Sequence, residues 1–129
     1  MAKFVDLTHN VTVTDGGVTA IDPGPLTHTR EVDEVTQGTL RINAGQDKFI
    51  CVAGVEGTEV SPTALGLVKI RGYLLGLDQP VEIREDGANP GVQRGPGFVV
   101  VDNTTLDSIK VVNGGALAAN IKYIIWGDR

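Results

Sequence analysis

The chain has 129 residues, of which 41% are hydrophobic, and a formal net charge of −5. This length fits one domain, and the apolar fraction is that of an ordinary globular protein, which excludes wholesale disorder. No apolar run approaches the ~18 residues of a membrane span, and no basic stripe favours nucleic acid as a partner. The first residues, MAKFVDLTHN, lack the apolar core of a secretory signal, so we expect no signal peptide.

Residues 1–37 are poor in large apolar side chains and rich in residues that break regular structure. Gly16 and Gly17, and the DPGP run at 22–25, are strong turn signals. Because such a segment can bury little apolar surface by itself, the sequence predicts an extended N-terminal arm. We expect short strands near residues 3–7 and 10–14, and a third near 29–36.

The same arm carries most of the net charge of the chain. It holds six acidic residues against two basic ones, a net charge of −4. An acidic segment suits a basic docking surface, so the acids are candidate contacts to a partner. The alternative is a solvated polar segment with no partner. The six acidic residues are Asp6, Asp15, Asp22, Glu31, Asp33 and Glu34.

From residue 38 to residue 129 the chain becomes a series of short alternating segments. Apolar and polar side chains alternate with a period of two in TLRIN (39–43), PVEIRE (80–85) and ANIKYIIWG (119–127). Glycine, asparagine, aspartate and proline separate these segments at short intervals. The sequence predicts an all-β domain over 38–129, an antiparallel β-sandwich or jelly roll, in which only residues 61–66 could form a helical turn.

The densest group of charges, Glu82, Arg84 and Asp86, stands next to a glycine turn. Glu82 and Arg84 leave one face of a predicted strand whose other face carries Val81 and Ile83. Opposite charges on one strand face are an ordinary solvated arrangement, whereas a catalytic carboxylate pair needs a pocket that raises one pKa. We therefore interpret this group as the solvent-exposed face of a strand.

Other residues with catalytic or ligand chemistry do not form a known motif. His9 and His28 lack the cysteine or histidine spacing that would complete a zinc site. Ser61 and Ser108 do not lie in a G-x-S-x-G elbow, and the apolar run around Cys51 is typical of a buried cysteine. The sequence predicts a protein that is not an enzyme, with no catalytic residue, metal or cofactor.

The last predicted strand, residues 119–127, has one face of unusual composition. That face begins with Asn120 and Lys122 and ends with Ile124 and Trp126, while the opposite face is apolar throughout. A strand that is apolar on both faces is covered on both. Either another part of the chain covers Ile124 and Trp126, or a neighbouring subunit does. The second alternative predicts a homo-oligomer with these two residues at its interface.

The aromatic residues bear on a different class of function. A sugar-binding β-sandwich needs two or more aromatic rings on one exposed face. The six aromatic residues of this chain lie in strand patterns typical of a core or an interface. They are Phe4, Phe49, Tyr73, Phe98, Tyr123 and Trp126.

Four segments of the C-terminal region together resemble small jelly-roll structural proteins of tailed-phage virions. They are PVEIREDG (80–87), GFVVV (97–101), IKVVN (109–113) and IIWGD (124–128). Each segment is common in β-sandwiches, and their order and spacing carry the resemblance. The first forty residues take no part in it.

The resemblance implies a non-enzymatic virion protein, in first place a capsid decoration (cement) protein that binds and stabilises the phage head shell. Such proteins commonly form trimers and clasp their neighbours with extended arms. The implied partners are the major capsid protein of the same virion and further copies of the chain, with no nucleic acid or membrane. The implied location is the capsid surface, after assembly in the host cytoplasm. A tail or neck component is the alternative.

Overall fold

The computed structural model describes residues 3–9, 13–21, 24, 26–54, 56–58, 61–65 and 67–129. Every regular element in these residues is a β-strand and every sheet is antiparallel, which confirms the predicted all-β class. Within the same residues there is no helix with the length and hydropathy of a membrane span. The chain divides into two compact units, residues 1–32 and 33–129.

The first unit contains two short two-stranded sheets. β1 (Lys3–His9) pairs with β4 (Leu26–Val32), and β2 (Val13–Asp15) pairs with β3 (Val18–Ile21). Gly16 and Gly17 connect β2 to β3 and both have positive φ, the conformation that a two-residue hairpin turn needs. The strand predicted near 3–7 is confirmed. Of the one predicted near 10–14, residues 10–12 lie outside the described residues.

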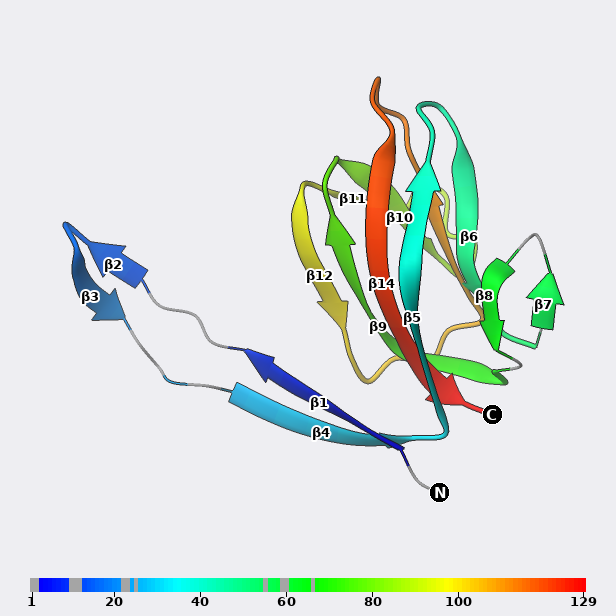
Figure 1. The fold of residues 1–129 in the computed structure, drawn as a ribbon, viewed down its shortest axis with the longest axis horizontal. Helices are drawn as coiled ribbons and strands as arrows, with labels where there is room; N and C mark the ends of the chain where they lie inside the picture. Colours follow the sequence, from blue (N-terminus) through cyan, green and yellow to red (C-terminus); the bar gives the residue numbers. More distant parts are fainter. Residues whose placement is uncertain are drawn as a thin grey trace. The chain divides into compact units, whose positions relative to one another are not determined.

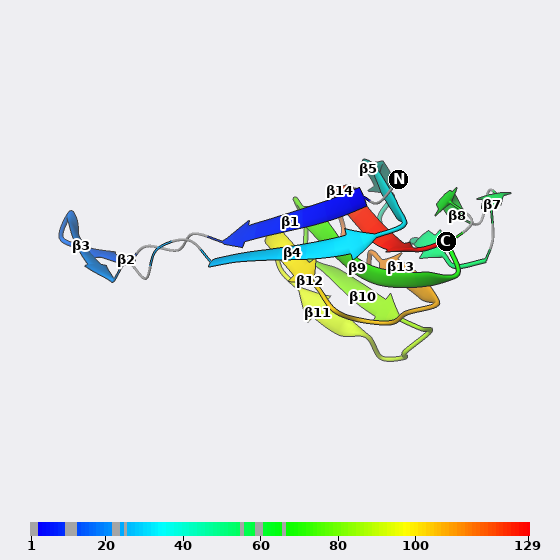
Figure 2. The ribbon, with the colours of Figure 1, turned by 90° about the horizontal axis from the view of Figure 1, so that it is seen from below.

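The second unit is sandwich-like, with two four-stranded sheets packed face to face (Figure 1). The β14 sheet has the order β12-β9-β14-β5 and contains β5 (Glu34–Ile42), β9 (Lys69–Leu77), β12 (Gly97–Val101) and β14 (Ala119–Asp128). The β13 sheet has the order β11-β10-β13-β6 and contains β6 (Asp47–Val52), β10 (Val81–Glu85), β11 (Val92–Arg94) and β13 (Ser108–Val112). Figure 2 shows the two layers from below.

A separate hairpin of β7 (Glu56–Thr58) and β8 (Ser61–Leu65) completes this unit. Residues 61–65 are therefore a strand, and the helical turn expected there is wrong. The SPTAL stretch contains a proline and no run of β-branched residues, so its sequence does not predict a strand. Pairing with β7 stabilises the strand.

The core lies between the two sheets and follows the period-two alternation of their strands. Ile121 and Ile125 of β14 are buried against Ile109 and Val111 of β13 in one continuous cluster. Burying one such side chain contributes about 1.5–3 kcal/mol. Cys51 belongs to the same cluster and is free, as expected from its apolar surroundings.

The division between the units lies earlier than the boundary predicted after residue 37. β5 begins at Glu34 and pairs with β14 along its whole length, from Glu34 opposite Gly127 to Ile42 opposite Ala119. Residues 33–37 thus belong to the sandwich. Their sequence, DEVTQ, is polar because β5 is an edge strand whose backbone, more than its side chains, holds it in the sheet.

Three aromatic residues of the β14 sheet lie directly opposite a glycine on the neighbouring strand. A β-carbon on Gly38 or on Gly72 would overlap the ring that lies across it. A β-carbon on Gly76 would only touch its aromatic partner, at 3.6 Å. Two of these glycines are therefore required by aromatic packing, and the third is not. The pairs are Tyr123 with Gly38, Trp126 with Gly72, and Phe98 with Gly76.

We predict that Gly72→Ala lowers the free energy of unfolding by about 1–3 kcal/mol, because the added methyl group forces the Trp126 indole out of place. Gly76→Ala is the matched control in the same strand. It should be neutral or stabilising, because it adds a side chain where there is room for one. Urea unfolding followed by circular dichroism measures both, and equal effects would contradict the explanation.

Candidate functional site

Glu82 and Arg84 share one face of β10, as predicted, but the two side chains are largely shielded from solvent. Their side chains are 11% and 23% exposed and form an ion pair of 3.0 Å between Glu82 Oε2 and Arg84 Nη2. The loop after β10 returns over the strand, and the Gly91 N–H donates to Glu82 Oε1 at 2.7 Å. Gly91 lies so close to the Ile83 carbonyl that a β-carbon would not fit. This carboxylate therefore holds a loop in place.

The same contacts set the charge state of Glu82. The Gly91 N–H and then the Arg84 guanidinium stabilise the carboxylate and lower its pKa, while partial desolvation opposes them. A general acid at neutral pH needs the opposite, a raised pKa. The absence of a catalytic role for this group stays a prediction.

Two neighbouring groups of the same region also serve the fold. The buried Tyr73 hydroxyl donates to Glu85 Oε1 at 2.5 Å and joins β9 of one sheet to β10 of the other. Burial, and then the Glu85 carboxylate, raise the pKa of Tyr73, so its phenol stays protonated as a donor. Asp86 Oδ1 accepts the N–H groups of Asp107 and Ser108 at 2.6 and 3.1 Å, which ties the turn after β10 to the start of β13.

The two histidines lie in the first unit and are not directly opposite each other. His9 faces Leu26 and His28 faces Leu7, and both histidines are exposed. The described residues hold no group of three histidine, cysteine, aspartate or glutamate side chains that could bind a metal ion.

The acidic residues assigned to the arm do not act as one group. Asp33 accepts the Arg129 N–H at 3.0 Å, and Glu34 pairs with the Arg129 guanidinium at 3.2 Å, so both hold the end of the chain within the sandwich unit. Asp6 accepts the Thr29 hydroxyl at 2.8 Å across the β1–β4 ladder.

The remaining three acidic residues of this set are Glu31, Asp15 and Asp22. Glu31 is exposed on β4. The side chain of Asp15, and Asp22 as a whole, lie outside the described residues. Because Asp33 and Glu34 belong to the sandwich, the first unit has four acidic and two basic residues, a net charge of −2 instead of the −4 assigned to residues 1–37.

The outer face of the β14 sheet carries a contiguous apolar patch. Val100, Leu74 and Ile124 lie directly opposite one another across β12, β9 and β14, and all three are half-buried. Phe98, two residues before Val100 on the same face, is 84% exposed. We refer to Leu74, Phe98, Val100 and Ile124 as the outer patch.

The patch is hollowed beside Gly76, where the sheet has no side chain. Two adjoining hollows of about 450 and 560 Å³ share Thr39, Gly76, Phe98 and Lys122. Lys122 is exposed and has no ion-pair partner among the described residues. An apolar patch with a polar rim is typical of a surface that binds another protein.

At one end of the first hollow a carboxylate is fixed in place. Asp78 accepts both the backbone N–H and the side-chain amide of Asn120, at 2.8 and 3.0 Å. The side-chain donor and then the backbone donor lower the pKa of Asp78, so this end of the patch carries a stabilised negative charge.

Ile124 and Trp126 differ in a way that the sequence did not reveal. Trp126 is 1% exposed in a single chain, with its indole over Gly72, whereas Ile124 is half-buried in the outer patch. The buried indole N–H has no acceptor among the described residues. Truncating Trp126 would leave a void over Gly72, so it is a poor probe of association. A role for Ile124 in an oligomer stays a prediction.

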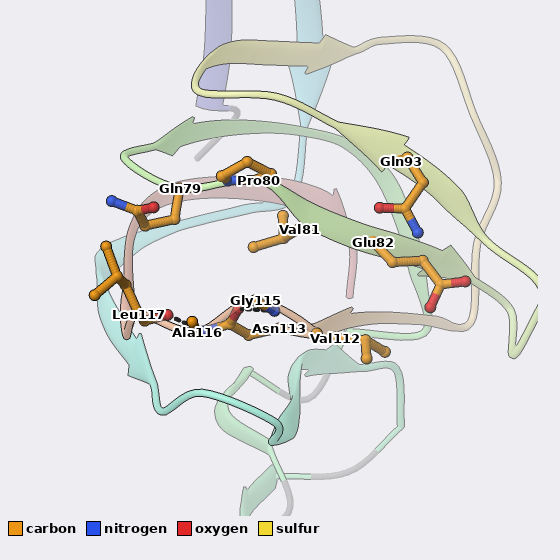
Figure 3. Close-up of a pocket in the computed structure, with 11 residues that line it drawn as sticks. Gln79, Pro80, Val81, Glu82, Gln93, Val112, Asn113, Gly115, Ala116 and Leu117 are labelled. Carbon is orange, nitrogen blue, oxygen red and sulfur yellow. Dashed lines mark hydrogen bonds between the residues drawn. The ribbon is translucent and has the colours of Figure 1, made fainter.

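Another hollow, of about 540 Å³, lies between residues 79–82 and the loop 113–117 (Figure 3). Asn113 is buried at its edge, and its amide donates to the carbonyls of Leu117 and Ile42 at 2.8 and 3.0 Å. Its oxygen accepts the Gly115 N–H at 3.1 Å. The side-chain amide of Asn113 thus closes the loop 113–117 and joins it to β5.

The six aromatic residues do not form a sugar-binding platform. Phe4 and Phe98 are 60% and 84% exposed and belong to different units. Tyr73, Tyr123 and Trp126 are buried, and Phe49 is half-buried with the Lys110 ammonium 5.1 Å from its ring centre. No two of them share an exposed face within either unit.

Comparison with known proteins adds little to this description. The chain matches no protein-family model and no curated protein. Among solved structures it is similar to the solution NMR structure of a de novo designed double-stranded β-helix, with a TM-score of 0.46 and 13% sequence identity. The match covers 70% of this chain and 97% of the designed one. Similarity of this degree supports no conclusion about function.

The lowered pKa of Glu82 gives a prediction for acid stability. Its folded pKa lies below the ordinary value of 4.5, so its contribution is complete above that pH and is lost as the pH falls through the folded pKa. Glu82→Gln should therefore lose less stability than the wild type between pH 7 and the acid range. Thermal unfolding across this range measures the difference. Glu31→Gln, an exposed carboxylate on β4, should follow the wild type.

Proposed function

We propose that this chain is a non-enzymatic structural protein of a tailed-phage virion, a capsid decoration protein that binds and stabilises the head shell. It acts as a homotrimer on the major capsid protein, at the capsid surface. The observation that carries the proposal is the outer patch on the β14 sheet, where Leu74, Val100, Ile124 and the exposed Phe98 form a contiguous apolar surface.

The chemistry of the patch favours a protein partner. The charged residues that line its two hollows, Lys122 and Asp78, have opposite signs. An apolar surface with such a rim suits a partner that also presents apolar side chains, with the charges fixing the orientation of the partner. A reaction centre would need a nucleophile, base or metal at the hollow, and its lining offers none of these in convergent geometry.

The positions of the four resembling segments support the virion assignment. PVEIREDG forms β10 and its turn, GFVVV forms β12, IKVVN covers β13, and IIWGD ends β14. The segments thus contribute strands to both sheets of the sandwich. If the resemblance reflects a shared fold, the four segments should lie on strands of the sandwich, as they do.

We further propose that the sandwich is a jelly roll. The strand order supports this, because successive strands of the sandwich alternate between the sheets except for the β10–β11 pair. One sheet holds β5, β9, β12 and β14, and the other holds β6, β10, β11 and β13. Eight strands wound in this way are the architecture of many viral capsid domains. The small hairpin of β7 and β8 is then an insertion between β6 and β9.

The first unit is proposed to be the arm that clasps a neighbour. Its β1–β4 pair is a two-stranded ribbon, which is marginally stable without a surface to lie on. One side of the ribbon exposes Phe4, Asp6 and Glu31, an aromatic ring between carboxylates. A basic and apolar surface of the shell would match it.

Two alternatives remain beside the decoration protein. A tail or neck component would use the same outer patch, and is distinguished by the part of the virion to which the protein binds. A sugar-binding module is less favoured, because it needs paired exposed aromatic rings and each unit has a single one.

We predict that a chain beginning at Asp33 stays folded and binds assembled shells more weakly than the full chain. It keeps every strand of both four-stranded sheets and loses only the proposed arm. A chain beginning at Gly38 is the control: it lacks the start of β5 and should melt at a lower temperature. Circular dichroism and co-sedimentation with shells measure the two effects. Undiminished binding by the shorter chain would remove the arm from the proposal.

We also predict that Ile124→Lys abolishes the trimer and weakens shell binding, because it places a charge within the outer patch, next to Leu74. Leu117→Lys, at another exposed apolar residue, should change neither. Sedimentation equilibrium gives the oligomeric state of each protein. A wild-type chain that neither forms trimers nor binds shells contradicts the proposed function.

A further inference from the structure

β12 is an open edge of the β14 sheet. It pairs with β9 alone, and no backbone hydrogen bond joins its other edge to any described residue. Its five residues, GFVVV, contain no charge and no proline. An uncharged edge of this kind is a template for pairing with another strand, and proteins usually block it with charge, proline or a covering element.

We propose that β12 of one copy pairs antiparallel with β12 of a second copy, so that two β14 sheets join across a two-fold axis. An antiparallel pair of identical strands is self-complementary, because each edge offers the same donors and acceptors to the other. The occupant of this edge is therefore a second copy of the chain. This inference does not depend on the virion assignment.

The flanking residues select one register. Pro96 has no N–H to donate and Asp102 carries a charge, so pairing is confined to residues 97–101. Full pairing of these residues places Val99 on the axis, opposite the partner's Val99. A shift in either direction loses pairs or draws Pro96 and Asp102 into the ladder.

In this register the outer faces of the two strands complement each other. Phe98 lies opposite the partner's Val100, and Val100 lies opposite the partner's Phe98. Aromatic and β-branched side chains make favourable cross-strand pairs, and the two-fold axis forms this pair twice. Asp102 lies opposite the partner's Pro96, so no like charges face each other. Phe98, the most exposed apolar side chain among those described, becomes covered on one side.

The contact is small and should be weak. Five paired residues bury less than the ~800 Å² per partner of a stable complex, so we expect a monomer–dimer equilibrium that depends on concentration. It is separate from the proposed trimer contact at Ile124, because paired antiparallel strands close a two-fold axis and not a three-fold one.

The first test is a charge exchange followed by sedimentation equilibrium up to millimolar protein. Phe98→Lys should weaken the two-fold association about tenfold, and Val100→Glu should weaken it similarly. Mixing the two variants should restore it, because the new lysine then lies opposite the new glutamate while the second pair stays native. Leu117→Lys is the control and should behave as the wild type. Failure of the mixture to recover association overturns the proposal.

The second test reads the register directly. Directly opposite residues have Cα atoms about 5 Å apart, within reach of a disulfide, whereas the diagonal neighbours are about 7–8 Å apart and out of reach. Phe98→Cys and Val100→Cys proteins, mixed under mild oxidation, should form a disulfide-linked dimer, and neither protein alone should do so. The native Cys51 is buried and does not compete. Equal cross-linking in the single-variant samples, or none in the mixture, overturns the proposal. If Ile124→Lys removes all association and the cysteine mixture forms no disulfide-linked dimer, the trimer proposal stands and the edge proposal falls.

Discussion

The β14 sheet depends on glycines that lie opposite large aromatic rings. Neighbouring strands are about 4.8 Å apart, so a ring can lie flat across the next strand only where that strand has no β-carbon. Gly38 admits Tyr123 on the inner face, and Gly72 admits Trp126 on the outer face. Both rings extend from the central strand β14. Tyr123 packs on β5 at Gly38, and Trp126 packs on β9 at Gly72.

The third pair of this kind has a different result. Gly76 has room for a β-carbon, and Phe98 comes from the edge strand β12, where no further strand covers the ring. The pairing of an aromatic ring with a glycine, which is tightly packed at Gly38 and Gly72, here leaves an exposed ring and a hollow beside it. The proposed binding surface and the proposed two-fold edge both derive from this arrangement.

Charged residues contribute to the fold more than their clustering in the sequence indicated. Glu82 holds the loop that ends at Gly91, and Asp33 with Glu34 holds the end of the chain through Arg129. Each carboxylate accepts hydrogen bonds from groups that the fold brings near it. These carboxylates therefore hold together parts of the chain that are distant in the sequence.

Features that depend on near neighbours along the chain could be predicted from the sequence. Period-two alternation predicted the all-β class and the two faces of β10 and β14, the Gly16 and Gly17 pair predicted a turn, and the apolar run around Cys51 predicted its burial. The folded structure was needed to show that residues 33–37 belong to the sandwich, that Trp126 is buried, and that Phe98 is exposed. These properties depend on which strands lie side by side and in which register. The residues that determine these properties, such as Gly72 for Trp126 and Arg129 for Asp33, are distant in the sequence. A local sequence pattern does not show which distant residues will be neighbours in the fold.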